Sequence, residues 1–155
     1  MKKPNIPAMT NDVCYDNSRN VIIMNTIRNL HSEGRTVLVL THRRQHAELL
    51  ANGVKELDPG LYLGGMKDLD ESNKKQIIIG TYSMCAEGYD NKYLNTVMLT
   101  TSKRDIRQTV GRVLGLRSSG SIQPMIVDIV DTYSVFRWQA RARRLYYEKQ
   151  GFEFD

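Results

Sequence analysis

Apolar residues in this sequence follow two patterns that alternate along the chain. From residue 19 to residue 33 they recur at helical spacing, with Ser18 as the expected N-cap and Gly34 as the stop: Ile23, Ile27 and Leu30. Residues 36–41 (TVLVLT) form a short, continuous apolar run, typical of a strand covered on both faces. A second helical repeat ends in the turn at residues 58–60: Ala47, Leu50, Val54 and Leu57.

The alternation continues to the C-terminus. Further strands are predicted at residues 61–63, 76–80, 95–100 and 125–130. One helix follows residue 100, with Ile106, Val110, Val113 and Leu114. A last helix would seal the sheet with Val135, Trp138, Ala142 and Leu145. Because parallel strands need long crossovers, the chain is predicted to be an α/β protein, a parallel sheet with helices on both faces. We expect one domain over residues 18–155, after a polar lead at residues 1–17.

Composition narrows the class of protein. A chain of 155 residues with 41% hydrophobic and 25% charged residues is typical of one soluble globular domain, which excludes a disordered, collagen-like or membrane-bundle protein. Cys14 and Cys85 lie far apart without a CxxC pair, which argues against a zinc module and a secreted disulfide scaffold. We expect an intracellular protein that binds no metal through its own residues. Composition does not distinguish nucleus, cytoplasm and virus factory.

The positive charge is concentrated in two segments. The net charge is +5, but residues 103–117 and 134–149 each carry five basic residues and one acid, so the remainder of the chain is net negative. This distribution favours a polyanionic partner over a uniformly basic surface. In the second segment Arg137, Arg141 and Arg144 share one predicted helix face. That face is either a solvated surface or an edge that meets nucleic acid or a partner.

Small, hydroxylated and basic residues follow the predicted strands. They include residues 41–44 (THRR), 64–65 (GG), 81–83 (TYS), 100–103 (TTSK) and 131–132 (DT). Ligands of open parallel sheets bind at the carboxyl ends of the strands, and these residue types bind phosphate through amides, hydroxyls and cations. The sequence therefore predicts a phosphate-binding edge.

Two motifs lie beside this edge. In Gln108-x-x-Gly111-Arg112, the side chains of Arg104, Gln108 and Arg112 share a helix face, and a glycine inside a helix suggests close packing. The second motif, residues 87–90 (EGYD), follows the predicted strand at 76–80.

In this order, the motifs resemble those of the second RecA-like domain of superfamily 2 helicases and translocases. Residues 36–50 look like motif IV, residues 63–65 (LGG) like the glycine pair that follows it, residues 80–90 like motif V and residues 108–112 like motif VI. The resemblance runs from about Arg19 to the C-terminus. Within the family, the motif set is similar to that of the DNA-directed branch that includes Rad25-like, UvsW-like and large-DNA-virus helicases.

The resemblance implies roles for particular residues. Gly88, Asp90, Gln108 and Arg112 would face an ATP bound between this domain and a preceding one, with Arg112 as the arginine finger. Gln108 would act beside it in catalysis, and Asp90 would meet the ribose or an interdomain partner. Residues along the nucleic-acid backbone would be Thr41, Arg43, Gly64, Gly65 and Thr81.

Each assignment has a plainer interpretation. Arg112 is alternatively a surface arginine paired with an acid such as Asp105. Thr41 and Thr81 are alternatively ordinary strand-end residues, and the glycine pair at 64–65 is alternatively only a turn. The three histidines lack metal-ligand or catalytic spacing, so they are interpreted as surface or packing residues.

The sequence also departs from the family pattern. Motif VI usually ends in a second arginine, where this chain has Gly115, which supplies no cation. Residues 91–92 (NK) stand where many members place a proline. The first difference predicts a weakened or differently wired ATP switch.

A motor also needs a P-loop, GxxxxGK[ST], and an acidic magnesium motif. The nearest segment, residues 60–67 (GLYLGGMK), lacks both the right lysine position and the Ser or Thr. The resemblance therefore implies the C-terminal half of an ATP-dependent helicase. ATP with Mg²⁺ would be held mainly by an N-terminal P-loop domain of the same protein, and the partner would be single- or double-stranded nucleic acid, with DNA expected. Alone, this half would not hydrolyse ATP. The alternative is a non-motor nucleic-acid-binding module derived from the same fold.

Overall fold

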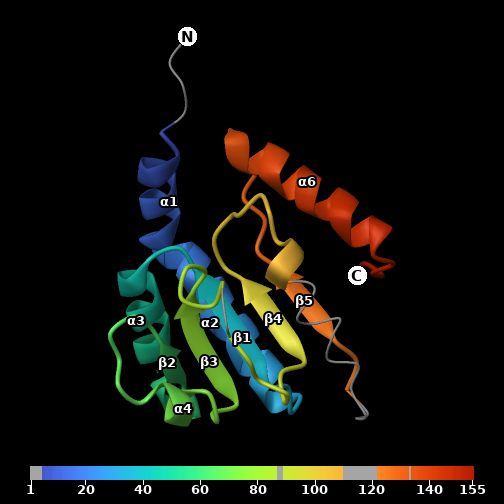
Figure 1. Ribbon diagram of the computed structural model, residues 1–155. Helices are drawn as coiled ribbons and strands as arrows, with labels where there is room; N and C mark the ends of the chain where they lie inside the picture. Colours follow the sequence, from blue (N-terminus) through green and yellow to red (C-terminus); the bar gives the residue numbers. More distant parts are fainter. Residues whose placement is uncertain (1–4, 87–88, 110–121, 133) are drawn as a thin grey trace.

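The chain folds around one parallel sheet. A computed structural model describes residues 5–86, 89–109, 122–132 and 134–155. These residues form five parallel strands in the order β2-β3-β1-β4-β5 (Figure 1). The strands are β1 (Val37–Thr41), β2 (Gly60–Tyr62), β3 (Ile77–Thr81), β4 (Thr96–Leu99) and β5 (Met125–Asp128). The predicted α/β class is therefore confirmed.

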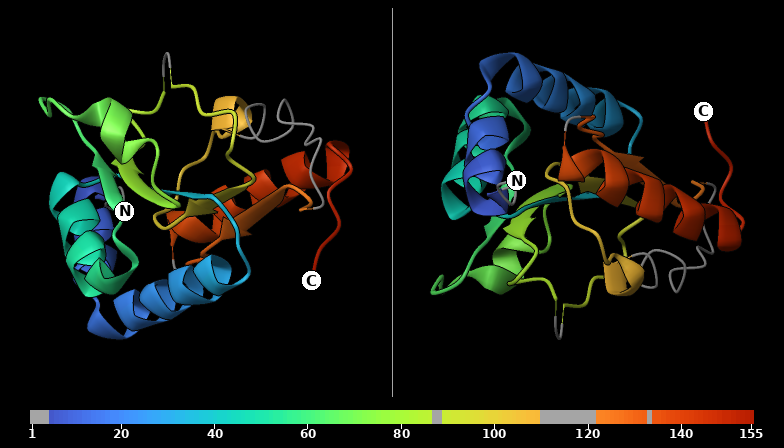
Figure 2. Two further views of the ribbon diagram at one scale, coloured as in Figure 1. Left: turned by 90° about the horizontal axis from the view of Figure 1, so that it is seen from below. Right: turned by 90° about the horizontal axis from the view of Figure 1, so that it is seen from above.

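Helices cover both faces of this sheet (Figure 2). The helices are α1 (Ile6–Cys14), α2 (Asn17–Ser32), α3 (Arg44–Gly53), a 3₁₀ turn (Lys55–Leu57), α4 (Leu69–Ser72) and α6 (Val135–Lys149). Side chains of α2 and α3 pack with Val37 and Val39 of β1 on one face. Tyr147 of α6 packs with Leu38 and Leu40 on the other. None of the helices in the described ranges is long and apolar enough to cross a membrane.

The N-terminal lead contains a helix that the sequence pattern did not predict. Asn5 caps α1 by accepting a hydrogen bond from the backbone N–H of Ala8 at 3.2 Å. The next helix, α2, starts earlier than expected, because Asp16, not Ser18, accepts from the backbone N–H of Arg19 at 3.1 Å. A polar segment interrupted by prolines gave no helical apolar repeat, although a proline in the first turn is compatible with a helix.

Helix α6 faces the sheet with a different side from the one predicted. Trp138 is 62% exposed and Leu145 is 54% exposed, so the expected seal of the sheet is wrong. The buried residues of the helix are Phe136, Arg143 and Tyr147.

The reason for this rotation is a buried ion pair. The Arg143 guanidinium donates to both carboxylate oxygens of Asp128 in β5, at 2.7 and 2.9 Å, and the Tyr147 hydroxyl donates to the same carboxylate at 2.8 Å. Arg143 is only 1% exposed. A buried charge needs such partners, and hydropathy alone does not reveal that a neighbouring strand supplies them.

The carboxyl ends of the strands point to the top of Figure 1, where α1 and α6 also lie. In the register between β1 and β3, Thr41 stands beside Thr81 at this edge. Residues predicted to bind phosphate from separate parts of the sequence therefore start from adjacent strands.

Candidate nucleic-acid and nucleotide interface

Thr41 ends β1 with its side chain inside the protein. Thr41 is fully buried, and its hydroxyl shares a 2.7 Å hydrogen bond with Nδ1 of His46, whose Nε2 lies 2.8 Å from Oδ1 of Asn20. Burial, followed by the charge of Arg19, lowers the pKa of His46 to about 4, so the imidazole is neutral near pH 7. The Thr41 hydroxyl, which the resemblance assigned to a nucleic-acid backbone, thus links β1 to α2 through α3. His46 is a packing residue, as the sequence suggested.

Thr81 ends the neighbouring strand and shapes the turn after it. Its hydroxyl accepts from the backbone N–H of Met84 at 3.3 Å, and its carbonyl accepts from the backbone N–H of Cys85 at 3.1 Å. Its relative exposure is 9%. These bonds hold residues 82–86 in a compact turn that projects from the sheet edge.

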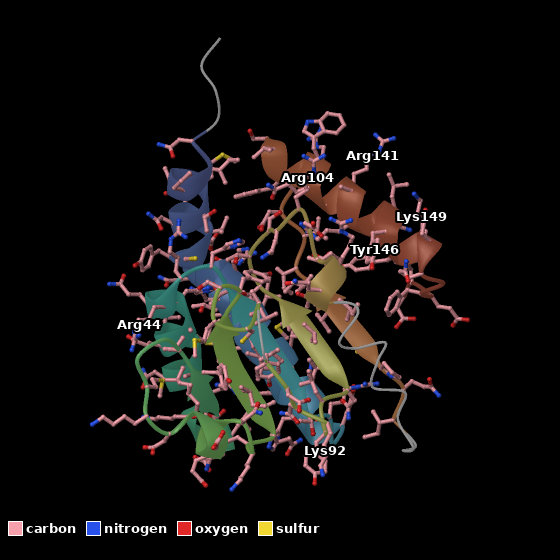
Figure 3. All side chains as sticks on the ribbon, viewed as in Figure 1. Arg44, Lys92, Arg104, Arg141, Tyr146 and Lys149 are labelled. Carbon is pink, nitrogen blue, oxygen red and sulfur yellow. The ribbon has the colours of Figure 1, made fainter. Side chains whose placement is uncertain are left out.

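The two arginines after β1, Arg43 and Arg44, bond to different partners. The Arg43 Nε donates to Oδ1 of Asn11 at 2.8 Å, so Arg43 ties α1 to this edge. Arg44 is exposed and donates to the carbonyl oxygen of Gly64 at 2.6 Å (Figure 3 shows its position on α3). The exposed cation beside the glycine pair is therefore Arg44. The sequence predicted Arg43 for this position. Helix α3 begins at Arg44, so the two side chains leave the backbone in different directions, and the apolar pattern did not locate that helix start.

Gly64 and Gly65 form an exposed turn after β2. Gly65 has φ +80°, a conformation that favours glycine, and a Cβ on either residue would meet open space. A turn is thus what the structure shows here. Its open surroundings leave room for the backbone of a ligand to approach closely.

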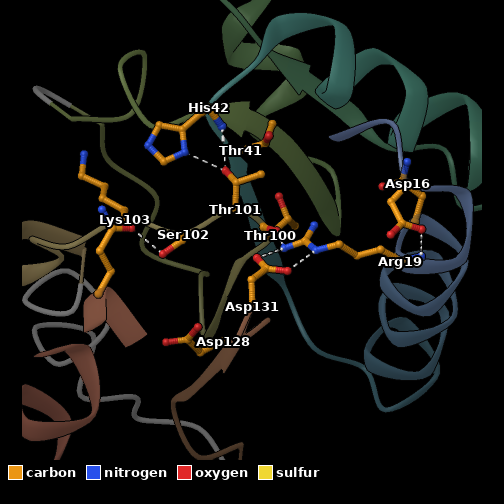
Figure 4. Close-up of polar contacts among 12 residues, drawn as sticks. Asp16, Arg19, Thr41, His42, Thr100, Thr101, Ser102, Lys103, Asp128 and Asp131 are labelled. Carbon is orange, nitrogen blue, oxygen red and sulfur yellow. Dashed lines mark hydrogen bonds and ion pairs between the residues drawn. The ribbon is translucent and has the colours of Figure 1, made fainter. Parts of the chain in front are cut away.

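A cluster of four side chains joins the ends of β1, β3 and β4 (Figure 4 shows three of them). Both the backbone N–H and Nδ1 of His42 lie within 3.0 Å of the Thr101 hydroxyl, and the Tyr82 hydroxyl donates to the Thr101 carbonyl at 2.7 Å. The Lys103 ammonium lies 5.0 Å from the centre of the Tyr82 ring. Burial, then the charges of Lys103 and Arg43, lower the pKa of His42 to about 4. The cluster is therefore a set of neutral groups bonded to one another, with one cation at its border.

Motif V is anchored by a residue that sequence reasoning missed. Asn73 donates from Nδ2 to the Asp90 carbonyl at 2.7 Å and accepts from the Tyr89 hydroxyl and the Asn91 amide at 2.7 and 3.1 Å. The Asp90 side chain is exposed. Asn91, where many family members have a proline, uses its side chain in this network. Gly88 lies outside the described residues.

Motif VI begins beside the same cluster. Gln108 is exposed and lines a hollow of about 570 Å³ together with Tyr82, Lys103 and Thr109. Asp105 accepts from the backbone N–H of Arg107 at 3.2 Å and pairs with its guanidinium at 2.8 Å, which holds the pKa of the Asp105 carboxyl at about 2. Asp105, one alternative partner for Arg112, is thus engaged with Arg107.

The remaining residues of motif VI lie outside the described residues. They are Gly111, Arg112 and Gly115, so the predicted shared face of Arg104, Gln108 and Arg112 has no structural description at Arg112. Among the described residues, no group of three His, Cys, Asp or Glu side chains is arranged to hold a metal ion. The polar groups around the hollow include the Lys103 ammonium, the Gln108 amide and the Thr109 hydroxyl, and the Asp105 carboxylate there is paired with Arg107. The cationic and neutral donors fit phosphate.

A second buried ion pair lies at the carboxyl edge of the sheet, after β5. Arg19 of α2 donates to both oxygens of Asp131 at 2.8 Å and also to the carbonyl of Thr100 (Figure 4). The pair links α2 to the segment after β5. Asp131 was expected to be a strand-end residue at the ligand edge, and here it is committed to an internal arginine.

Comparison with known proteins places this geometry in a family. No family model matches the chain. A protein of Acanthamoeba polyphaga mimivirus named as an ATP-dependent RNA helicase, L396, is 36% identical over 161 residues, which cover 99% of this chain and 31% of the viral protein. An African swine fever virus protein, also named as an ATP-dependent RNA helicase, QP509L, is 28% identical over 95 residues, 59% of this chain and 19% of its own length. The chain therefore spans about a third or less of these relatives.

Solved structures show the same fold. T4 UvsW superposes with a TM-score of 0.72 at 19% identity over 97% of this chain and 36% of its own. The C-terminal part of the Fun30 ATPase domain gives 0.62 at 12% identity over 80% of this chain and 44% of its own. The Escherichia coli DEAD-box protein SrmB gives 0.56 at 16% identity over 71% of this chain and 68% of its own. The solved structures show the fold, and with the ordered motifs the viral relative supports a C-terminal RecA-like domain of the superfamily 2 helicase type.

Proposed function

We propose that this chain is the C-terminal motor domain of an ATP-dependent nucleic-acid helicase or translocase. It supplies one wall of the nucleic-acid groove and the arginine finger, Arg112, to an ATP held by a preceding P-loop domain. The observation that carries this proposal is the convergence of Gln108, Lys103 and Tyr82 on one hollow at the carboxyl edge of the sheet. The share of the viral relatives that the chain covers is consistent with a motor half.

The nucleic-acid wall is formed by exposed groups of the sheet edge. The exposed guanidinium of Arg44, which also pairs with Glu48, lies beside the open backbone of the turn at Gly64 and Gly65, and Lys103 offers an ammonium. Thr41 and Arg43 act behind this surface, because their polar groups are engaged with His46 and Asn11. Phosphate contacts of this kind bind without reading sequence.

The ATP side would be formed by motif V and the first residues of motif VI. The exposed side chains of Asp90 and Gln108 are available to a nucleotide, and Asn73 fixes the backbone at Asp90. Gly88 and Arg112 would complete this side. A fixed guanidinium at the terminal phosphates would stabilise the charge that develops as the bond to the leaving group breaks.

The test is nucleic-acid-stimulated ATP hydrolysis by the full-length protein. Arg112→Ala should reduce the stimulated rate about a thousandfold, as expected for an arginine finger. Arg28→Ala, which changes a half-buried arginine of α2 bonded to Glu56 and the Gly53 carbonyl, is the control and should keep the parental rate. An unaffected Arg112→Ala enzyme would remove the finger from this assignment. Tight nucleic-acid binding with no ATPase in the full-length protein would favour the non-motor module.

Whether DNA or RNA is the preferred nucleic acid is a separate question. The sequence resemblance predicts DNA, whereas both viral relatives carry names that specify RNA. We keep DNA as the proposal because the resemblance favours the DNA-directed branch. Stimulation of the ATPase by DNA at lower concentrations than RNA of the same length supports it, and the reverse order would replace DNA with RNA.

A further inference from the structure

The outer side of α6 carries an apolar and cationic stripe with no covering element among the described residues. It consists of Trp138, Arg141, Leu145 and Lys149, spaced so that all four share one helix face, which we call the outer stripe. The buried residues Phe136, Arg143 and Tyr147 occupy the opposite face. In Figure 3, Arg141 and Lys149 both point away from the body of the domain.

The other arginines of α6 are bonded to partners, whereas the cations of the outer stripe form no ion pair among the described residues. Arg143 is buried against Asp128, Arg144 lies 3.4 Å from Glu148 and 4.3 Å from the centre of the Phe154 ring, and Arg137 donates to the Thr132 carbonyl at 3.0 Å. Among the described residues, no carboxylate lies within 4 Å of the charged group of Arg141 or Lys149. Glu148, the one acid in α6, is already taken by Arg144. The stripe therefore keeps an uncompensated positive charge.

A second cationic surface borders the outer stripe. A hollow of about 470 Å³ lies between α6 and the segment after β4, lined by Arg104, Arg107, Ala142 and Tyr146. Asp105 also lines this hollow and is paired with Arg107, whereas Arg104 forms no ion pair within 4 Å among the described residues. Figure 3 places Arg104 beside α6. Arg104 thus lines a hollow with Ala142 and Tyr146 of α6, and Arg141 follows Trp138 by three positions on the same helix.

We propose that the outer stripe of α6 binds single-stranded nucleic acid, with a base stacked on Trp138 and adjacent phosphates paired with Arg141 and Arg104. Stacking on an exposed aromatic ring beside cations is the usual basis of sequence-independent single-strand binding. Charge complementarity favours a polyanion over an apolar protein surface. This surface rests on the proposed function only in taking nucleic acid as the ligand. The hollow that Arg104 lines adjoins the Lys103 and Gln108 hollow, with which it shares Asp105 and Arg107.

The single tryptophan of the chain makes the proposal directly measurable. Trp138 is the one tryptophan in the sequence, so its fluorescence reports on the stripe alone. Titration of the chain with unlabelled oligothymidylate or oligouridylate should quench this emission as a base stacks on the indole. The apparent affinity should fall as salt rises, because phosphate contacts release counterions.

Variants separate stacking from charge. With a labelled oligonucleotide, Trp138→Ala should weaken Kd about tenfold, and Trp138→Phe should restore most of the affinity because phenylalanine still stacks. Arg141→Ala should weaken binding about threefold and reduce the slope of log K against log salt by about one. The matched controls on α2, across the sheet, are Ile22→Ala at an exposed position and Arg28→Ala at a half-buried one, and both should bind like the parent.

Two results would overturn the proposal. One is saturating nucleic acid that leaves the Trp138 emission unchanged, together with parental binding by Trp138→Ala. The other is self-association of the chain that Trp138→Ala abolishes, which would assign the stripe to a protein interface. Neither result touches the role of Arg112 in ATP hydrolysis, so failure here is distinguishable from failure of the proposed function.

Discussion

The two long helices, α2 and α6, meet the sheet in different ways. Helix α2 buries an apolar row, Ile23, Ile27 and Leu30, and uses Arg19 only at its first turn to reach Asp131. Helix α6 buries Arg143 at its centre and leaves Trp138 in solvent. The apolar row of α2 follows from the periodicity of its own sequence, whereas the burial of Arg143 in α6 depends on a carboxylate of β5.

The largest expected effect is on the α6 interface. Arg143→Ala leaves Asp128 without its cation, and loss of one partner from a buried pair costs about 4 kcal/mol of the free energy of unfolding. Chemical denaturation of the purified chain measures this loss. The triple replacement Arg143→Met, Asp128→Leu and Tyr147→Phe should recover most of it, because the buried carboxylate is removed together with its cation and only the bonds of Arg143 to Ser102 and the Lys103 carbonyl are lost. Wild-type stability in Arg143→Ala would show that α6 does not depend on the pair.

On the α2 side the comparable change is Ile27→Ala. Ile27 is fully buried, and truncation of such a side chain removes apolar contacts and leaves a cavity, at a cost of about 3 kcal/mol. Denaturant midpoints of this variant and of Ile22→Ala measure the difference between a buried and an exposed position on the same helix. Ile27→Ala should show the larger loss. Equal effects at the two positions would contradict the orientation of α2.

Mild acid should weaken the α2 side, where α3 reaches α2 through His46 and Asn20. The folded pKa of His46 is about 4, below the ordinary value near 6.5, so the unfolded chain takes up the proton first as pH falls. Stability is then complete above about pH 6.5 and is lost towards pH 4, with a slope of up to about 1.4 kcal/mol per pH unit for each such imidazole. Urea unfolding at a series of pH values tests this. His46→Gln should reduce the slope, and a slope unchanged by that substitution would refute the assignment.

The smallest expected effect on stability is that of Trp138→Ala. Because the indole is 62% exposed, its removal should change the free energy of unfolding by less than about 0.5 kcal/mol, while it weakens nucleic-acid binding. Thermal or urea unfolding of this variant measures the change in the free energy of unfolding. A loss of several kcal/mol would mean that Trp138 is part of the core, as its hydropathy had suggested.

These contrasts explain which features were predictable from sequence. The strands and α2 were predictable because continuous apolar runs and a helical apolar repeat need no outside partner. The helix in the lead and the orientation of α6 were not, since a first-turn cap and a buried arginine act against the hydropathy pattern. The class of the protein followed from the order of its motifs.

The site was predictable in position but less so in detail. Residues such as Thr81 and Gln108 lie at the expected sheet edge, because strand ends can be read from the pattern. The partners of Arg43 and Asp90 could not be foreseen, since Asn11 and Asn73 lie 32 and 17 positions away in the sequence. The roles of Gly88, Arg112 and the other assigned residues stay predictions.

The account depends most on the claim that this chain is one half of a motor. ATP hydrolysis by the chain alone and by the full-length protein, each with and without single-stranded DNA, tests that claim directly. The account predicts hydrolysis only in the full-length protein, with a marked increase when DNA is added. Hydrolysis by the isolated chain, or a full-length protein whose rate does not respond to DNA or RNA, would contradict it.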